Sequence, residues 1–265
     1  MLSKLFRKKK KEPQEKKPLQ KKPNERGKAH ISKRKGEIGE YKIDIQLDQM
    51  PKEYKHMSDL LIENPKSKSG YSQVDHVLIT SYGIFVIETK NYQGTVYGGK
   101  DRKTWSVNGK FKMMNPFFQN YGHIQALKKI IGEKYEGSMV SIVSFTKRCT
   151  FKIDTNLRDI KENQLIVYDM ELSEFINRKI HVQKLIHKQP LITAEEVHHI
   201  YGEIKKQHIS NPDVLKRHVE ALNDTSETTR STCVVCEKEV SNKVKSFCLN
   251  NKKFEGEIYC YNHQK

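Results

Sequence analysis

Two apolar stretches joined by a short turn constrain the fold of this chain more than any other feature of its sequence. Residues 73–80 alternate apolar and polar side chains, residues 81–83 read Ser-Tyr-Gly, and residues 84–90 pass from apolar into polar residues. This pattern predicts a β-hairpin with β-branched strands. Because residues 84–87 are all apolar, we expect the second strand to be central and covered on both faces.

The segments around this hairpin predict the layers that would cover it. Apolar and alternating runs predict further strands at 55–63, 94–97, 104–107, 139–145 and 164–167. Helical spacing and boundary residues predict helices over about 36–49, from Asn115-Pro116 onward, over about 170–179 and over about 193–208. A mixed central sheet flanked by helices buries these faces economically, so the predicted fold class is α/β.

The composition argues against an integral membrane protein and against a secreted domain built on disulfide bonds. Hydrophobic residues make up 35% of the 265 residues, and no run approaches the ~18 apolar residues of a membrane-spanning helix. The N-terminus has no apolar segment ahead of a small-residue cleavage site, which argues against a secretory signal. Five cysteines, four of them in the last 33 residues, do not read as a disulfide framework. We therefore predict a cytoplasmic protein.

Most of the excess positive charge lies at the N-terminus. Residues 1–35 contain 15 lysines and arginines and 3 acids, which supplies +12 of the formal net charge of +17. Because this segment has three prolines and few apolar residues, we predict a disordered basic tail. Such a tail could bind a polyphosphate backbone or serve only solubility. A third alternative is weak contact with an anionic membrane through Leu2, Leu5 and Phe6 and the basic run at 7–11.

Charged residues interrupt the apolar hairpin at one end. Asp75 lies near the start of the first strand, and Glu88 and Lys90 share one face near the end of the second. Antiparallel pairing would bring Asp75 beside Glu88, and two adjacent carboxylates raise each other's pKa unless a cation intervenes. Oxygen ligands of this kind suit Mg²⁺ or Mn²⁺. The set suits metal-assisted hydrolysis of a phosphodiester, although an isolated Glu-x-Lys is usually a surface ion pair.

This motif and its surroundings resemble a known family. Asp75 with the run at 87–90 is similar to the D…ExK signature of the PD-(D/E)xK nuclease superfamily. A wider pattern over about 36–150 resembles the nuclease-related domain family. The positions that carry it are 36–40, 73–77, 83–91, Trp105, 115–116, 119–120, His123 and 126–127. The resemblance implies a restriction-endonuclease-like α/β core that uses a divalent metal. Val74 stands where the superfamily name has a proline, at a position that varies in the superfamily.

The resemblance implies the composition of the catalytic core. Asp75, Glu88 and Lys90 would form it. Asp75 and Glu88 would hold Mg²⁺ or Mn²⁺ together with the carbonyl of Thr89, and Lys90 would position the attacking water.

The resemblance implies two further catalytic residues on helices. Glu40 on the first helix would be an additional acidic group, with Glu37 one turn away as the competing candidate. Gln119 would assist from the later helix. Gln119 could equally be an ordinary amide that satisfies backbone groups, and we expect His123 to be structural rather than a ligand.

The C-terminal cysteines form a second candidate site. Cys233-Val-Val-Cys236 and Cys260-Tyr-Asn-His263 are two close ligand pairs separated by 23 residues, which suits tetrahedral Zn²⁺. A module of about 33 residues has too small a core to fold unaided, so the metal would contribute its folding energy. The pattern predicts a structural zinc site that resembles zinc ribbons and fingers. Cys248 is the reserve ligand if His263 is not one.

These observations divide the chain into parts and lead to one principal function. The parts are a disordered basic tail over 1–35, a nuclease-related core over 36–150, an α/β extension over 151–208, a linker over 209–232 and a zinc-binding module over 233–265. We expect a metal-dependent nuclease that acts on DNA, with affinity for the backbone added by the tail and the zinc module. The alternatives are a non-catalytic nucleic-acid-binding protein with the same fold and a membrane-surface or protein-interaction factor.

Overall fold

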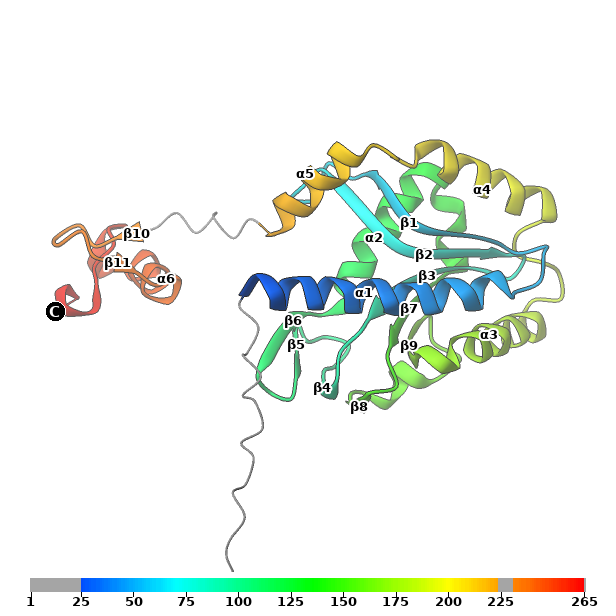
Figure 1. Ribbon diagram of the computed structural model, residues 1–265, viewed down its shortest axis with the longest axis horizontal. Helices are drawn as coiled ribbons and strands as arrows, with labels where there is room; N and C mark the ends of the chain where they lie inside the picture. The colour runs from blue at the N-terminus through cyan, green and yellow to red at the C-terminus, as the bar shows by residue number, and fades with distance from the viewer. Residues whose placement is uncertain (1–24, 224–230, 265) are drawn as a thin grey trace, which may run out of the picture.

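A five-stranded mixed sheet forms the centre of the fold (Figure 1). The computed structural model describes residues 25–223 and 231–264. The strand order is β1-β2-β3-β7-β9, with β1, β2 and β3 antiparallel and with β3, β7 and β9 parallel. The strands span Lys55–Glu63 for β1, Tyr71–Thr80 for β2, Gly83–Lys90 for β3, Met139–Phe145 for β7 and Gln164–Tyr168 for β9.

One face of this sheet is covered by α1 (Glu25–Asp48) and α3 (Leu172–Ile186) (Figure 1). Ile43 and Leu47 of α1 are buried against Phe85 of β3 in a cluster that also contains apolar residues of α3. Two helices that are far apart in the sequence therefore cover this face. A strand that is apolar on both sides, as β3 is, needs such a cover on each face of the sheet.

The opposite face is covered by α2 (Pro116–Ile131) and α4 (Ala194–Gln207). Leu127 of α2 and Ile200 of α4 are buried in one cluster with Val86 of β3. The start of α2 is fixed by Asn115, whose side-chain oxygen accepts a 2.9 Å hydrogen bond from the backbone N–H of Phe117. This cap, together with Pro116 at the first helical position, fixes where α2 begins.

A second sheet packs beside the central one, with the strand order β6-β5-β4-β8. Its strands span Gly94–Tyr97 for β4, Thr104–Val107 for β5, Phe111–Met114 for β6 and Cys149–Lys152 for β8. Trp105 is buried here against Phe117 at the start of α2, with ring centroids 6.1 Å apart. The indole N–H donates to the carbonyl of Gly99, so the single tryptophan is a core residue.

The C-terminal residues form a small ββα unit. It consists of β10 (Ser231–Thr232), β11 (Glu239–Val240) and α6 (Asn242–Asn250), and β10 and β11 are antiparallel. The predicted class, a mixed sheet flanked by helices with a small C-terminal module, is confirmed. Among the described residues no helix is both long and apolar enough to cross a bilayer.

Three details differ from the sequence predictions. The first helix begins at Glu25 rather than at about 36, so the predicted disordered tail overlaps it; the rest of that tail, including the proposed membrane contact at 2–11, lies outside the described residues. The predicted linker over 209–232 contains α5 (Pro212–Asn223). The short edge strands β6 and β8 were not predicted. The edge strands have four residues each, too few to give a periodic pattern. In α5 the apolar residues Leu215, Val219 and Leu222 do have helical spacing, but the polar composition of 209–232 concealed it.

Candidate active site

The hairpin of β2 and β3 brings Asp75 and Glu88 to the same end of the sheet. The regular pairing ends at His76 opposite Ile87, so the next position along the hairpin places Asp75 across from Glu88. The Asp75 carboxylate accepts a hydrogen bond from the backbone N–H of Thr89 at 2.7 Å. Asp75 is therefore fixed by the strand that carries Glu88.

Glu88, Lys90 and Gln119 form a closed hydrogen-bonded group. Lys90 Nζ lies 2.5 Å from Glu88 Oε1 and 3.0 Å from Gln119 Oε1. Gln119 Nε2 in turn donates to Glu88 Oε1 at 2.7 Å. Only 3% of the Glu88 side chain and 18% of the Lys90 side chain are exposed. This Glu-x-Lys pair is not a surface ion pair, because both partners lie in the interior at the end of a central strand.

His123, four residues after Gln119 on α2, faces the second oxygen of Glu88. Its Nε2 lies 3.4 Å from Glu88 Oε2, and its ring is almost completely buried. Neither ring nitrogen of His123 nor Glu88 Oε2 has a hydrogen-bond partner among the described residues. Sequence reasoning treated His123 as structural; its i, i+4 spacing from Gln119 is the signal that could have placed both on one face of α2.

The protonation of this group follows from burial and from neighbouring charges. Burial, and then the charge of Glu88, raises the pKa of Asp75 well above its usual value. Burial opposes ionisation of Glu88 too, but the Lys90 cation and His123 outweigh it and lower the pKa of Glu88. Burial would likewise lower the pKa of Lys90, and the Glu88 carboxylate outweighs it and raises that pKa. Glu88 and Lys90 are thus held as an ion pair.

The first helix approaches the end of β3 at Gly39. A Cβ at this position would lie 3.3 Å from both Asn91 Cβ and Thr89 Cγ2, so only glycine allows this close approach without adjustment. The next residue, Glu40, is half-buried. Burial and the charges of Asp59 and Glu88 raise its pKa. Glu40 is therefore electrostatically coupled to the site, whereas Glu37 one turn earlier is exposed.

The acidic residues fit a hard cation only in part. A buried oxygen of Glu88 that accepts no hydrogen bond from the described residues, and a neighbouring aspartate with a raised pKa, are features that a divalent cation would satisfy. Within the described residues, however, Glu40, Asp75 and Glu88 do not gather their ligand atoms within 4.8 Å of one another. The three carboxylates therefore do not form a closed ligand cluster, and Glu40 is coupled to Glu88 and Asp75 through its charge.

Asn120 is adjacent to Gln119 but has a different environment. It is fully buried, and its Nδ2 donates at 2.8 Å to both the carbonyl of Val86 and the hydroxyl of Ser141. These contacts tie α2 to β3 and β7. Of the two adjacent amides, Gln119 contacts the charged group and Asn120 holds the helix on the sheet.

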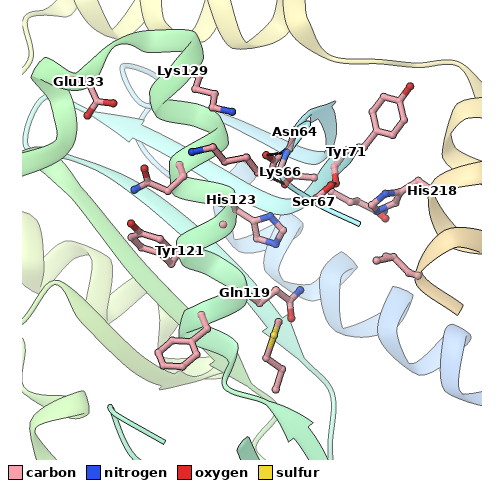
Figure 2. Close-up of a pocket in the computed structure, with 17 residues that line it drawn as sticks. Asn64, Lys66, Ser67, Tyr71, Gln119, Tyr121, His123, Lys129, Glu133 and His218 are labelled. Atoms are coloured by element: carbon pink, nitrogen blue, oxygen red, sulfur yellow. Dashed lines mark hydrogen bonds between the residues drawn. The ribbon is translucent and has the colours of Figure 1, made fainter. Parts of the chain in front are cut away.

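A cavity of about 900 Å³ opens beside the charged group (Figure 2). We call it the α2–α5 cavity, because α2, α5 and the turn between β1 and β2 contribute its walls. Its lining includes Lys66, Gln119, His123, Lys129 and His218. The cavity therefore reaches the two α2 residues that contact Glu88.

Comparison with known proteins places this arrangement in a family. The family described as nuclease-related domain matches residues 35–146, which include the hairpin and the whole of α2. The chain is also 31% identical over 201 residues to an uncharacterized Bacillus anthracis protein, pXO1-01, and covers 88% of it. The chain belongs to the nuclease-related domain family.

Similarity to the B. anthracis relative covers 74% of this nuclease-related domain protein, so it extends beyond the family domain itself. A crystal structure described as a protein of unknown function, AF1548, is 9% identical, with a TM-score of 0.27, and the match spans 64% of the present protein and 97% of AF1548.

The C-terminal module brings its four predicted ligands together. The ligand atoms of Cys233, Cys236, Cys260 and His263 all lie within 4.8 Å of one another, and no other such group occurs among the described residues. Cys236 Sγ and Cys260 Sγ are 3.8 Å apart, and His263 Nδ1 lies 3.3 Å from Cys260 Sγ. This cluster is able to hold a metal ion of the zinc type.

The module also decides between the alternative ligands. Cys248 is buried outside the cluster, where its sulfur accepts from the backbone N–H of Tyr259 and donates to the carbonyl of the same residue. His263, rather than Cys248, is the fourth member of the cluster. Desolvation opposes ionisation of Cys233, but the backbone N–H groups of Cys260, Val235 and Cys236 lower its pKa to about 5, which favours the thiolate that a metal needs.

Proposed function

We propose that this protein is a divalent-metal-dependent nuclease that hydrolyses phosphodiester bonds in DNA. The observation that carries the proposal is the buried group of Glu88, Lys90 and Gln119, fixed beside Asp75 in a family related to nucleases. Burying a lysine and two carboxylates at the end of a central strand costs free energy, and an ordinary surface ion pair does not require that burial. A site for a metal and a phosphate explains why they are there.

The residues have distinct roles in this proposal. Asp75 and Glu88, with the carbonyl of Thr89, would hold Mg²⁺ or Mn²⁺, and Glu40 would act on the same ion through water. When bound, the cation activates water and neutralises charge on the phosphate.

Lys90 contributes as a cation rather than as a base. Its pKa is raised, so it stays protonated, and an ammonium group has three N–H donors. Glu88 and Gln119 accept two of them. No acceptor for the third lies among the described residues, so it could orient the attacking water or donate to a phosphate oxygen.

We also propose that the C-terminal cluster binds structural Zn²⁺. Four protein ligands would fill the tetrahedral shell that Zn²⁺ prefers and would leave no open position for a substrate, which supports a structural role rather than a catalytic one. The net charge of +17 supports a polyanionic partner for the whole protein.

The test is cleavage by the full-length protein with Mg²⁺ or Mn²⁺ against plasmid, single-stranded DNA, duplex DNA and RNA. We expect metal-dependent cleavage of DNA that falls by at least about 100-fold in Asp75→Asn, Glu88→Gln and Lys90→Met. Glu203→Gln is the matched control, because Glu203 and Lys206 form an exposed ion pair at 2.6 Å. This control should cleave like the wild type.

Two results would contradict the nuclease proposal. One is that the wild type cleaves none of these substrates with either metal while remaining folded; salt-dependent DNA binding without cleavage would then favour the non-catalytic alternative. The other is cleavage that persists unchanged in the three site variants, which would point to a contaminant or to another site.

A further inference from the structure

The α2–α5 cavity carries two lysines that come from different elements. Lys66 extends from the turn between β1 and β2, and Lys129 lies on the last turn of α2. Figure 2 shows their ammonium ends converging over the cavity. Neither makes an ion pair within the described part of the protein, and the nearby Glu133 is engaged by Lys128 at 2.5 Å. Two converging ammonium groups favour an anion between them.

The cavity connects these lysines to the proposed cleavage site. Gln119 and His123 belong to its lining, and both face Glu88, at 2.7 and 3.4 Å respectively. The buried His123 ring has no hydrogen-bond partner within the described residues. An occupant that fills the cavity would therefore contact Gln119 and His123 at one end and the two lysines at the other.

The size of the cavity limits what can occupy it. At about 900 Å³ it is in the range of small-ligand pockets, about 300–1,000 Å³, which suits one strand rather than a double helix. The wall that limits it on one side is α5, which lies beyond the matched family domain. His218 of α5 is buried, and its Nδ1 shares a 2.7 Å hydrogen bond with the hydroxyl of Ser69 in the β1–β2 turn.

The remaining lining suits nucleotides rather than an unrelated anion. Met114, Phe118 and Tyr121 are part of it and are 57%, 44% and 60% exposed. Exposed aromatic rings beside lysines are typical of surfaces that bind single strands, where bases stack and phosphates are neutralised.

We infer that the α2–α5 cavity binds an unpaired strand of nucleic acid next to the cleavage site, with a backbone phosphate between Lys66 and Lys129. The inference rests on the proposed nuclease function and narrows its substrate to DNA with a single-stranded segment. The segment that follows the family domain thereby contributes to substrate selection, because α5 forms one wall of the cavity.

The experiment measures binding separately from cleavage. Dissociation constants are measured for a fluorescent single-stranded oligonucleotide and for a blunt hairpin of the same length. All proteins carry Asp75→Asn, and no Mg²⁺ or Mn²⁺ is added, so turnover does not intervene. The test variant is Lys66→Gln with Lys129→Gln. The control is Lys110→Gln with Lys188→Gln, which removes the same charge at exposed lysines outside the cavity.

We expect the cavity variant to bind the single strand about tenfold more weakly than its control, with little change for the hairpin. Loss of the phosphate contact should lower the dependence of log K on log salt for the single strand by about 0.7 for each lysine that contacts the backbone. Lys66→Arg with Lys129→Arg should restore most of the affinity, which a merely structural defect would not allow.

The outcomes separate this inference from the proposed function. Equal losses for single strand and hairpin, or a cavity variant that behaves like its control, would overturn the inference even if the wild type cleaves DNA. Selective loss of single-strand binding would support it even if no cleavage is found, and the nuclease proposal alone would then fail.

Discussion

Glu88 stays charged in the interior only because of its neighbours. Lys90, Gln119 and His123 each approach it within 3.4 Å, and the first of these supplies a full positive charge. Removing the cationic partner from a buried carboxylate leaves an uncompensated charge, which is costly. The environment of each residue, more than its identity, thus decides whether a change affects chemistry or stability.

Two adjacent amides on α2 test this distinction. We expect Gln119→Ala to lower the rate of cleavage by about tenfold with little loss of stability, because its partners are the charged residues. We expect Asn120→Ala to destabilise the fold by about 1–3 kcal/mol, because it leaves the Val86 carbonyl and the Ser141 hydroxyl without their donor. Urea unfolding and initial cleavage rates measure the two effects. If both variants lost only stability, Gln119 would have no special role.

At the scale of elements, the fit of α1 against β3 depends on one glycine. A Cβ at Gly39 would lie 3.3 Å from Thr89 and Asn91, whereas at Gly36 the nearest atom, Glu40 Oε1, is 3.7 Å away. Both lie inside the same helix, where alanine is favoured over glycine by about 0.5–1 kcal/mol.

We therefore expect Gly36→Ala to stabilise the protein by about 0.5–1 kcal/mol and Gly39→Ala to give no such gain. The comparison is made by urea unfolding of both variants and the wild type. Equal stabilisation by the two substitutions would show that the close contact between Gly39 of α1 and the end of β3 does not limit the side chain at position 39.

The attachment of α5 should depend on pH through His218. Burial, and then the nearby His123, lowers the pKa of His218 below its usual value of about 6.5. An undocked α5 would bind the proton more readily than a docked one, so docking is favoured above about pH 6.5 and weakens as the pH falls below it. Hydrogen-exchange protection of 212–223 should decrease between pH 7.5 and pH 5.5 after correction for intrinsic rates. His218→Gln should remove this dependence; an unchanged pH profile in that variant would contradict the assignment.

At the scale of the whole molecule, two units depend on different sources of stability. The core has three buried apolar clusters around its sheets, whereas the module over 231–264 has few buried residues and one metal-type cluster. Small units of this kind fold with their metal.

We expect a strong zinc chelator to release about one Zn²⁺ per protein molecule and to remove hydrogen-exchange protection from 231–264 while the core keeps its own. Cys236→Ser should lose the metal. Cys248→Ala is the control and should keep it, because Cys248 lies outside the cluster. Metal loss in the Cys248 variant alone would reverse the assignment of the fourth ligand.

Much of this protein could be predicted from its sequence because the signals are local. The apolar run at 84–87 predicted a central strand, and the close spacing of the cysteine pairs predicted their common site. Asp75, Glu88 and Lys90 could be placed together because a short hairpin leaves only one register for its strands.

What the tertiary structure alone decided involves residues that are far apart in the sequence. Nothing near His123 in the sequence shows that it faces Glu88, and nothing near 212–223 shows that this helix closes a cavity against the β1–β2 turn. A hydrophobic pattern fixes which face of an element is buried, but not which partner covers it. The sequence by itself therefore determined the fold class, the charged hairpin and the metal-type cluster. Packing between distant elements determined the surroundings of the charged group and the shape of the cavity beside it.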